Sequence, residues 1–344
     1  MPPLHAICIL AMALAVVGSA NAQSSPEAAI PVGVDNFARA ESDLYLGKMV
    51  ATGSLGRFVH SREAVPIDAQ NVVRMNRDTL YSSAVFDLDA GPVTITLPEA
   101  DGRFMSMAVI NEDHYVPLVT YGAGRQTLSK ESVGTRYVFV AVRTFFDPAD
   151  RKDLEKVHAL QDAMTVSQAK VGEFVVPKWD PASQAKVRAA LEVLGSTIPD
   201  YNQSFGPKGA VNPIHHLIGT ATGWGGNPAK DAIYLGGVMP QNDGHAVYRL
   251  KVGEVPVNGF WSVSVYNADG YFQKNPQDAY SLNNLTAKKS EDGSIAIQFG
   301  GCDATIANCL PTTPGWNYTV RLYQPSEQLL NGQWSFPKPE LVAR

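Results

Sequence analysis

Residues 80–88, LYSSAVFDL, decide the fold class, because apolar and polar side chains alternate along them. Side chains two residues apart in a β-strand lie on the same face. One face would carry Leu80, Ser82, Ala84, Phe86 and Leu88, and the other Thr79, Tyr81, Ser83 and Asp87. The pattern predicts a strand with one buried face.

Further strand-like runs follow at residues 93–97, 104–110, 115–120 and 136–142. The turn signals Gly91-Pro92 and Asp101-Gly102 separate the earlier runs. FMSMAVI (104–110) and YVFVAV (137–142) are apolar on both faces, which is typical of central strands that are covered on both sides. The first half of the chain therefore predicts a β-sandwich or jelly-roll-like domain.

The last third of the chain predicts a second β-domain, with strands at residues 246–252, 260–266, 294–299 and 318–323. In the last strand Tyr318, Val320 and Leu322 alternate with Thr319, Arg321 and Tyr323. We expect one face of this domain to be apolar and buried, and the other to face solvent.

Helical signals lie at the start of the chain and between the two β-rich parts. Residues 35–49 predict a helix, and helices are also expected at 151–164 and at about 182–194. Asp147-Pro148 and Asp180-Pro181 each place an N-cap acid before a proline at the first helical position. The predicted fold is mainly β with a helical insert: residues 23–146 and 223–344 form two β-sandwich or jelly-roll-like domains, joined by the helical segment 147–222.

The composition is that of a folded protein of about two domains: 344 residues, 45% of them hydrophobic and 18% charged. The net charge of -5 argues against nucleic-acid binding, which needs a clustered cationic surface. No His-Glu-x-x-His, Gly-x-Ser-x-Gly, phosphate-loop or dinucleotide pattern occurs. We therefore expect neither a metal nor a cofactor, although sites assembled from distant residues stay open.

The N-terminal residues predict export. An uncharged apolar run at 7–17 is followed by small residues at 18–22, so we expect a signal peptide that is cleaved after Ala22. No later run is long and apolar enough to predict a transmembrane segment. The mature protein is expected in the periplasm or outside the cell, where Cys302 and Cys309 would form a disulfide. Two free thiols are the alternative.

Two stretches resemble a known family: NRDTLYSSAVFDL (76–88) and GFWSVSVYNADGY (259–271). Residues 160–162 (LQD), 223–226 (GWGG) and 280–282 (YSL) fit the same pattern. The chain resembles bacterial proteins, often called cell envelope proteins, that pair domain of unknown function 1254 with domain of unknown function 1214 C-terminal to it. The resemblance implies β-sandwich-like domains with a helical segment between them, and it implies no activity and no catalytic residue.

The strongest polar cluster comes where the chain enters the strand at residue 80. It consists of Asn76, Arg77, Asp78, Thr79, Tyr81 and Ser82. Arg77 could hold a carboxylate, Asp78 could act as acid and base or accept sugar hydroxyls, and Tyr81 could stack on a ring or donate a proton. The structural alternative is that Asn76 and Asp78 bind their own backbone and that Arg77 and Asp78 lock two loops together.

His114 and Tyr115 form a second candidate, between two predicted strands. His114 could titrate near neutral pH beside a carboxylate, which would suit acid–base catalysis. A polar hairpin turn is the alternative. Trp224, Tyr271 and Phe272 are a third candidate, an aromatic platform for a sugar, although most aromatic residues in β-sandwiches belong to the core.

Three functions remain open at this point. The first is binding of a small polar ligand or a cell-surface polymer through Asn76, Arg77, Thr79, Ser82, Tyr115, Trp224 and Tyr271. The second is a cofactor-independent, hydrolase- or lyase-like enzyme that uses Asp78, Tyr81 and His114. The third is a non-catalytic envelope assembly module, which predicts a homo-oligomer. For the first two, the interface between the β-domains is the expected place for a pocket.

Overall fold

The computed structural model describes residues 28–70, 73–303 and 305–343. The predicted signal peptide and its cleavage site lie outside the described residues.

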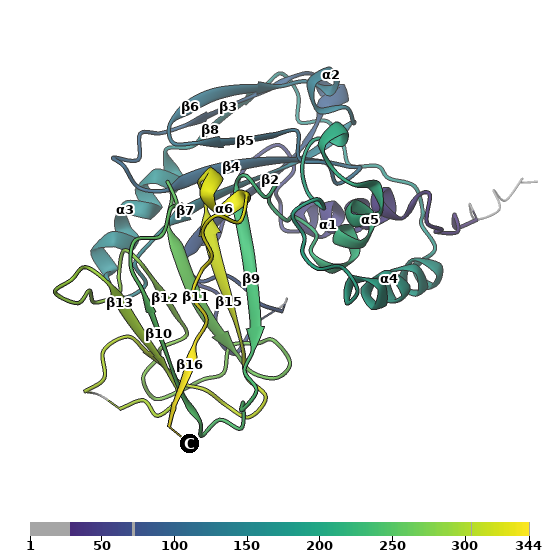
Figure 1. The fold of residues 1–344 in the computed structure, drawn as a ribbon. Helices are drawn as coiled ribbons and strands as arrows, with labels where there is room; N and C mark the ends of the chain where they lie inside the picture. The colour runs from purple at the N-terminus through teal and green to yellow at the C-terminus, as the bar shows by residue number, and fades with distance from the viewer. Residues whose placement is uncertain (1–27, 71–72, 304, 344) are drawn as a thin grey trace, which may run out of the picture.

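The N-terminal domain packs two sheets against each other (Figure 1). The five-stranded antiparallel sheet has the order β1 (Val59–His60), β2 (Thr79–Asp87), β7 (Tyr137–Phe145), β4 (Met105–Asn111) and β5 (Leu118–Tyr121). The three-stranded sheet has the order β6 (Gly124–Leu128), β3 (Val93–Leu97) and β8 (Thr165–Gln168). Phe86, Val140 and Met107 of the larger sheet share one core with Val93 and Ile95 of the smaller one.

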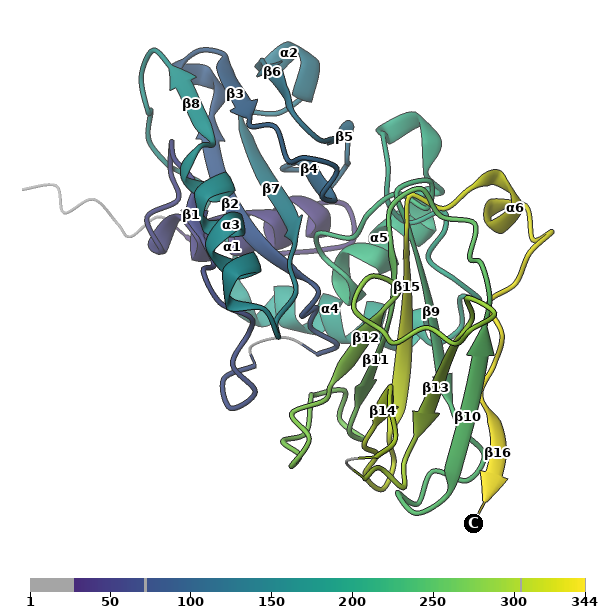
Figure 2. The ribbon, with the colours of Figure 1, turned by 90° about the vertical axis from the view of Figure 1, so that its left-hand side faces the viewer.

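Three helices gather on one side of this domain, as both ribbon views show (Figures 1 and 2). They are α1 (Phe37–Ala51), α4 (Pro181–Gly195) and α5 (Pro213–Thr222), and the shorter helices are α2 (Lys130–Val133), α3 (Arg151–Asp162) and α6 (Glu327–Leu330). Phe37, Leu191 and Ile218 tie the three together. No helix within the described residues combines the length and the apolar character that crossing a membrane requires.

One of the two predicted N-caps is correct. Asp180 accepts a hydrogen bond from the backbone N–H of Ser183 and precedes Pro181 at the start of α4. Helix α3, however, is capped by Asp150, whose carboxylate accepts from the N–H of Lys152. Asp147 instead closes a turn by accepting from the N–H of Ala149, so α3 begins at Arg151, as predicted, and not at Pro148.

The C-terminal domain is a pair of four-stranded sheets. One has the order β12 (Ser281–Asn283), β11 (Trp261–Tyr266), β15 (Asn317–Tyr323) and β9 (Ala232–Val238). The other has the order β14 (Cys309–Leu310), β13 (Ile295–Phe299), β10 (Val247–Val252) and β16 (Glu340–Ala343). Val263, Leu322, Leu250 and Ile297 meet in the core between them. The predicted disulfide between Cys302 and Cys309 is present.

The prediction of a solvated face is correct for β10, where Arg249 and Lys251 are exposed between buried apolar residues, but it is wrong for β15. Thr319, Arg321 and Tyr323 are only 7%, 3% and 3% exposed. The N-terminal domain covers this face: Phe104 packs on Tyr323, with ring centroids 5.3 Å apart. A polar strand face therefore lies at a domain interface instead of in water.

The mainly β class and the helices in the middle of the chain are confirmed. All four sheets are open, with strand orders that depart from chain order. The segment 147–222 carries α3, α4 and α5, but it also contains β8, which returns to complete the three-stranded sheet. The middle of the chain thus belongs structurally to the N-terminal domain.

Candidate functional site between the two domains

A row of polar side chains crosses the five-stranded sheet at its interface with the C-terminal domain. Tyr81 on β2 pairs with Arg143 on β7, Arg143 pairs with Ser106 on β4, and Ser106 pairs with Tyr121 on β5. The C-terminal sheet supplies a second row, in which Tyr234 on β9 pairs with Arg321 on β15. We call Tyr81, Arg143, Asn227, Tyr234 and Tyr323 the interdomain site.

Arg143 is at the centre of the interdomain site. Its guanidinium donates to the Tyr81 hydroxyl (3.4 Å), to Oδ1 of Asn227 (3.3 Å) and to the carbonyl of Gly225 (3.3 Å). Arg143 is 8% exposed, and no carboxylate of the described residues forms an ion pair with it. Burial lowers the pKa of Arg143, but Tyr81, Tyr234 and Tyr323 together raise it above its usual value. The site therefore holds a buried cation that is not ion-paired with any acidic side chain of the described residues.

Arg321 is the second arginine of the interface, and its contacts are different. It donates to Ser264 (2.9 Å), to Tyr266 (2.8 Å) and to the carbonyls of Arg74 (2.7 Å) and Met75 (3.2 Å). Three of these four bonds are 2.9 Å or shorter, and the two to the carbonyls hold the segment before β2 against the C-terminal sheet. Arg321 is a structural clamp, whereas Arg143 makes only long hydrogen bonds.

The three tyrosines around Arg143 differ in acidity. Burial raises the pKa of Tyr81, but Arg143, Asn76 and Arg321 together outweigh burial, so this pKa lies below its ordinary value. Burial raises the pKa of Tyr234 and that of Tyr323. Tyr234 is 40% exposed as a residue, yet its hydroxyl end is enclosed and accepts a hydrogen bond from Asn227 (2.7 Å).

The predicted cluster before β2 is split by the structure. Nδ2 of Asn76 donates to the Tyr323 hydroxyl (3.0 Å) and to Thr79 (3.1 Å), so these residues adjoin the interdomain site. Asp78 is 2% exposed; its Oδ1 accepts from Ser281 (2.8 Å), and no donor among the described residues reaches its Oδ2. Arg77 points elsewhere, to the carbonyl of Val65 and over the ring of Tyr280.

His114 reaches the interdomain site through Gly225. Its Nε2 accepts from the N–H of Gly225 (2.8 Å), so the ring proton is on Nδ1, which donates to Thr220 (2.8 Å). Burial and the nearby His216 lower the pKa of His114 well below its usual value. Gly225, at φ 83°, is thus held by His114 on its N–H while its carbonyl accepts from Arg143. No hydrogen bond or shared partner joins His114 to Asp78 among the described contacts.

The other predicted site residues lie apart from Arg143. Ser82 is on the opposite face of β2, where its hydroxyl meets Nδ1 of His60 (2.7 Å). Tyr115 stacks on His216, with ring centroids 4.3 Å apart. Trp224 stacks on Tyr45 and His114 in one apolar cluster, and Phe272 packs with Tyr266 and Tyr280 in another.

The aromatic platform is therefore not assembled. The backbone N–H of Tyr271 is fixed by Asn267 in a turn (3.0 Å), next to Phe272 and away from the cluster that contains Trp224.

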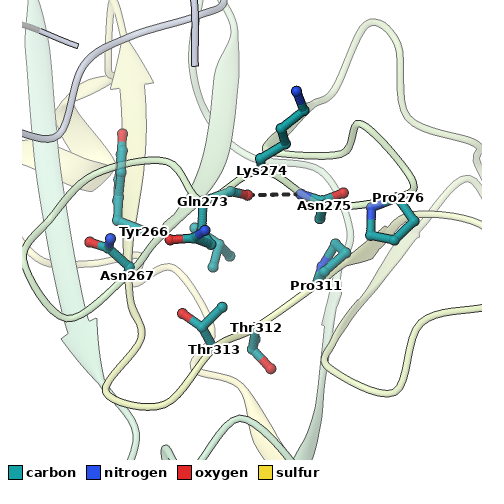
Figure 3. Close-up of a pocket in the computed structure, with 10 residues that line it drawn as sticks. Tyr266, Asn267, Gln273, Lys274, Asn275, Pro276, Pro311, Thr312 and Thr313 are labelled. Atoms are coloured by element: carbon teal, nitrogen blue, oxygen red, sulfur yellow. Dashed lines mark hydrogen bonds between the residues drawn. The ribbon is translucent and has the colours of Figure 1, made fainter. Parts of the chain in front are cut away.

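Two surface pockets lie elsewhere. One, of about 250 Å³, is lined by amide and hydroxyl side chains of the C-terminal loops, including Asn267, Gln273, Asn275 and Thr313 (Figure 3). The other, of about 490 Å³, adjoins Arg77, Phe146 and Arg151. Within the part of the chain that the structure describes, no group of three or more His, Cys, Asp or Glu residues could hold a metal ion.

The residues predicted from sequence motifs do not include Arg143, Asn227, Tyr234 and Tyr323 of the interdomain site, or Arg321 of the clamp. A signal was available for the two arginines, because each interrupts an apolar run: VFVAVRTF for Arg143 and YTVRLY for Arg321. A charge in the middle of a buried strand needs partners.

This geometry defines a mainly β, two-domain protein with a buried arginine–tyrosine site at the domain interface. The model of DUF1254, a domain of unknown function, matches residues 55–127, and that of DUF1214, a protein of unknown function, matches residues 239–327. The resemblance to proteins that pair these two domains is confirmed. Tyr81 lies within the first match, and Arg321 and Tyr323 lie within the second, while Arg143, Asn227 and Tyr234 lie between them.

Two solved structures share the fold. The VPA0106 protein from Vibrio parahaemolyticus is 17% identical, with a TM-score of 0.71 over 90% of this chain and 97% of that one. A putative uncharacterized protein from Burkholderia cenocepacia is 13% identical, with a TM-score of 0.51 over 90% of this chain and 88% of that one. No curated protein sequence matches the chain.

Proposed function

We propose that the protein binds a small, polar, negatively charged molecule at the interdomain site, with Arg143 as its anchor. The observation that carries this proposal is the buried guanidinium of Arg143, which has three neutral partners at 3.3–3.4 Å and no ion pair with a described carboxylate. A buried charge without an opposite charge is costly. An anionic ligand would supply the missing charge.

The donor pattern of Arg143 favours a carboxylate. A guanidinium has five N–H groups, and the structure uses one on Nε, one on Nη1 and one on Nη2. One N–H on each terminal nitrogen is left, and such a pair binds both oxygens of a carboxylate. Tyr81 and Tyr234 add hydroxyl groups for the polar remainder of the ligand.

We place the entrance beside Tyr234. This residue is 40% exposed on the edge strand β9, and the neighbouring Gly225 and the facing Tyr81 are each partly exposed. The rest of the interdomain site is closed by the two domains.

Isothermal titration calorimetry with L-malate, D-galacturonate and inorganic phosphate tests the proposal. We expect the wild-type protein to bind at least one carboxylate, and Arg143→Met to weaken that binding at least about 30-fold, which corresponds to about 2 kcal/mol for a lost charged hydrogen bond. Arg249→Met is the matched control, because Arg249 lies on β10 and donates to Gln298 away from the site. Equal affinity in wild type and Arg143→Met would contradict the proposal.

We also propose that the protein is exported. The Cys302–Cys309 disulfide supports this, because disulfides persist in oxidising compartments. The mass of the protein from a periplasmic fraction should equal that of residues 23–344 with no alkylatable thiol. A full-length mass with free thiols would contradict export.

A further inference from the structure

We infer that the pocket of about 490 Å³ beside Arg77 is a second binding site, and that it takes a monocarboxylate with an apolar chain or ring. We call it the Arg77 pocket. None of the five residues of the interdomain site lines it, so the two sites bind their ligands separately and can be tested independently.

The walls of the Arg77 pocket are mostly apolar and come from two segments that are far apart in the sequence. The loop between β1 and β2 contributes Ala64, Pro66 and Ile67, and the segment from the end of β7 into α3 contributes Phe146, Pro148 and Leu154. Phe146 is 2% exposed and packs with Leu154, which anchors this wall in the N-terminal domain. Small-molecule sites are typically apolar cavities of about 300–1,000 Å³ with a few polar groups that orient the ligand. The size and the lining of the Arg77 pocket agree with this description.

Arg77 is the polar group that orients the ligand. Its Nη1 donates to the carbonyl of Val65, and its guanidinium carbon lies over the ring of Tyr280, 5.3 Å from the centroid. No carboxylate of the described residues forms an ion pair with Arg77. Hydrogen bonds within the described residues leave the N–H groups on Nε and Nη2 unused. These two nitrogens form one edge of the guanidinium, and that edge binds both oxygens of a carboxylate.

The surroundings of Arg77 compensate its charge only in part. Burial lowers the pKa of Arg77, and the nearby Asp278, Tyr280 and Asp78 oppose this shift without outweighing it. Asp78 is directed to the C-terminal domain, where its Oδ1 accepts from Ser281 (2.8 Å). A carboxylate on the free edge of Arg77 would supply the missing charge while its apolar part lies on the carbon walls.

The exposed part of the Arg77 pocket favours a ligand with a single negative charge. Glu63, Asp150 and Arg151 line the pocket and are exposed, so two acids stand there against one base. The Asp150 carboxylate also caps α3 by accepting from the N–H of Lys152 (2.9 Å). A second negative charge on the ligand would meet these acids, whereas an uncharged chain or ring would not.

Isothermal titration calorimetry with butyrate and octanoate tests the inference. We expect the wild-type protein to bind octanoate at least about 10-fold more tightly than butyrate, because burial of one CH₂ group raises affinity by up to about fourfold. Arg77→Met should weaken octanoate binding at least about 10-fold, because it removes the charged donors that hold the carboxylate.

Ala149→Trp is a second variant that leaves Arg77 in place. Ala149 is exposed on the pocket wall, and only its backbone N–H bonds to Asp147, so a larger side chain fills the pocket without removing a hydrogen bond. We expect this variant to weaken octanoate binding at least about 10-fold and to keep the urea midpoint of the wild type.

Arg57→Met is the matched control, because Arg57 also donates to a backbone carbonyl, that of Gly53 (2.9 Å), but does not line the pocket. Arg57→Met and Arg143→Met should both bind octanoate with the wild-type affinity. No binding of octanoate to the wild type, equal affinities for butyrate and octanoate, or an unchanged octanoate affinity in Arg77→Met or in Ala149→Trp would overturn the inference. Loss of octanoate binding in Arg143→Met would place the carboxylate in the interdomain site and would overturn it as well. Failure of L-malate to bind would concern only the interdomain site.

Discussion

The two faces of the central strands β11 and β15 are both buried, yet they differ in chemistry. One face carries Trp261, Val263, Val320 and Leu322 and belongs to the core of the C-terminal sandwich. The other carries Ser262, Ser264, Thr319, Arg321 and Tyr323 and lies against the N-terminal domain. Alternation along a strand thus separates two faces correctly, but it does not say that the polar one meets water.

The two faces contribute to the stability of the protein in different ways. The apolar face gains free energy from every buried carbon. The polar face gains free energy only where each buried group has a partner. Within the described residues, Ser262 and Asn317 on this face, and Asp78 opposite β12, each keep one buried atom without a hydrogen bond. Such unsatisfied groups persist where function requires them. We therefore expect substitutions on the polar face to divide into clamp residues, which cost stability, and site residues, which do not.

Arg321→Met should have the largest effect. The substitution leaves the Tyr266 and Ser264 hydroxyls and the carbonyls of Arg74 and Met75 without their shared donor. We expect the free energy of unfolding to fall by about 4 kcal/mol, measured by urea denaturation with circular dichroism. A loss below about 1 kcal/mol would show that Arg321 is not a clamp.

The N-terminal domain contains a buried carboxylic acid, Asp43, that should make the stability of the protein depend on pH. Burial first, and then Glu112, raise the pKa of Asp43 on α1 to about 7, although the Trp179 indole donates to its carboxylate and opposes the shift. A folded-state pKa above the unfolded value of 3.8 means that the protonated form favours folding. The contribution is full below about pH 4 and is lost as the pH rises through about 7.

Asp43 should therefore lower the free energy of unfolding of the wild type by about 2 kcal/mol between pH 5 and pH 7.5. Urea titrations at the two pH values measure this difference. Asp43→Asn keeps an acceptor for Trp179 and cannot ionise, so its stability should change less between the two pH values. Parallel curves for the two proteins would rule out the raised pKa.

Ser262→Ala should have the smallest effect, and its sign is informative. Ser262 is fully buried on β11, and its hydroxyl has no hydrogen-bond partner in the part of the chain that the structure describes. Removing an unsatisfied hydroxyl is expected to leave the thermal midpoint unchanged or to raise the stability by up to about 1 kcal/mol. A loss above about 1 kcal/mol would reveal a hydrogen bond that Ser262 makes in solution.

Much of the fold was predictable from local patterns. The strand predicted at 93–97 matches β3 at both ends, and Asp180-Pro181 begins α4 as expected. Strand β9 was missed because Gly236 and Gly237 interrupt its alternation. A Cβ at Gly237 would come within 2.4 Å of the Tyr318 ring on the neighbouring strand, so this position requires glycine. The sequence of β9 alone does not reveal this contact.

The candidate site was predictable only in part. Asn76, Asp78 and Tyr81 stand together in the sequence as a polar group at a strand entrance, and Asn76 and Tyr81 adjoin Arg143 or its neighbours. The other residues of the interdomain site come from β7, β9, β15 and the loop at Asn227. Which residues of distant strands face one another depends on register and on domain docking, and neither follows from alternation within one strand.

The most direct test of the account is the stability of Arg143→Met, measured by urea unfolding with and without the carboxylate that binds the wild type. We expect Arg143→Met to lose at most about 1 kcal/mol of stability, because the three hydrogen bonds of Arg143 are long. The variant should also lose the stabilisation that the carboxylate gives the wild type. A loss of about 3 kcal/mol or more, with the carboxylate still stabilising the variant, would contradict this expectation and make Arg143 a second clamp.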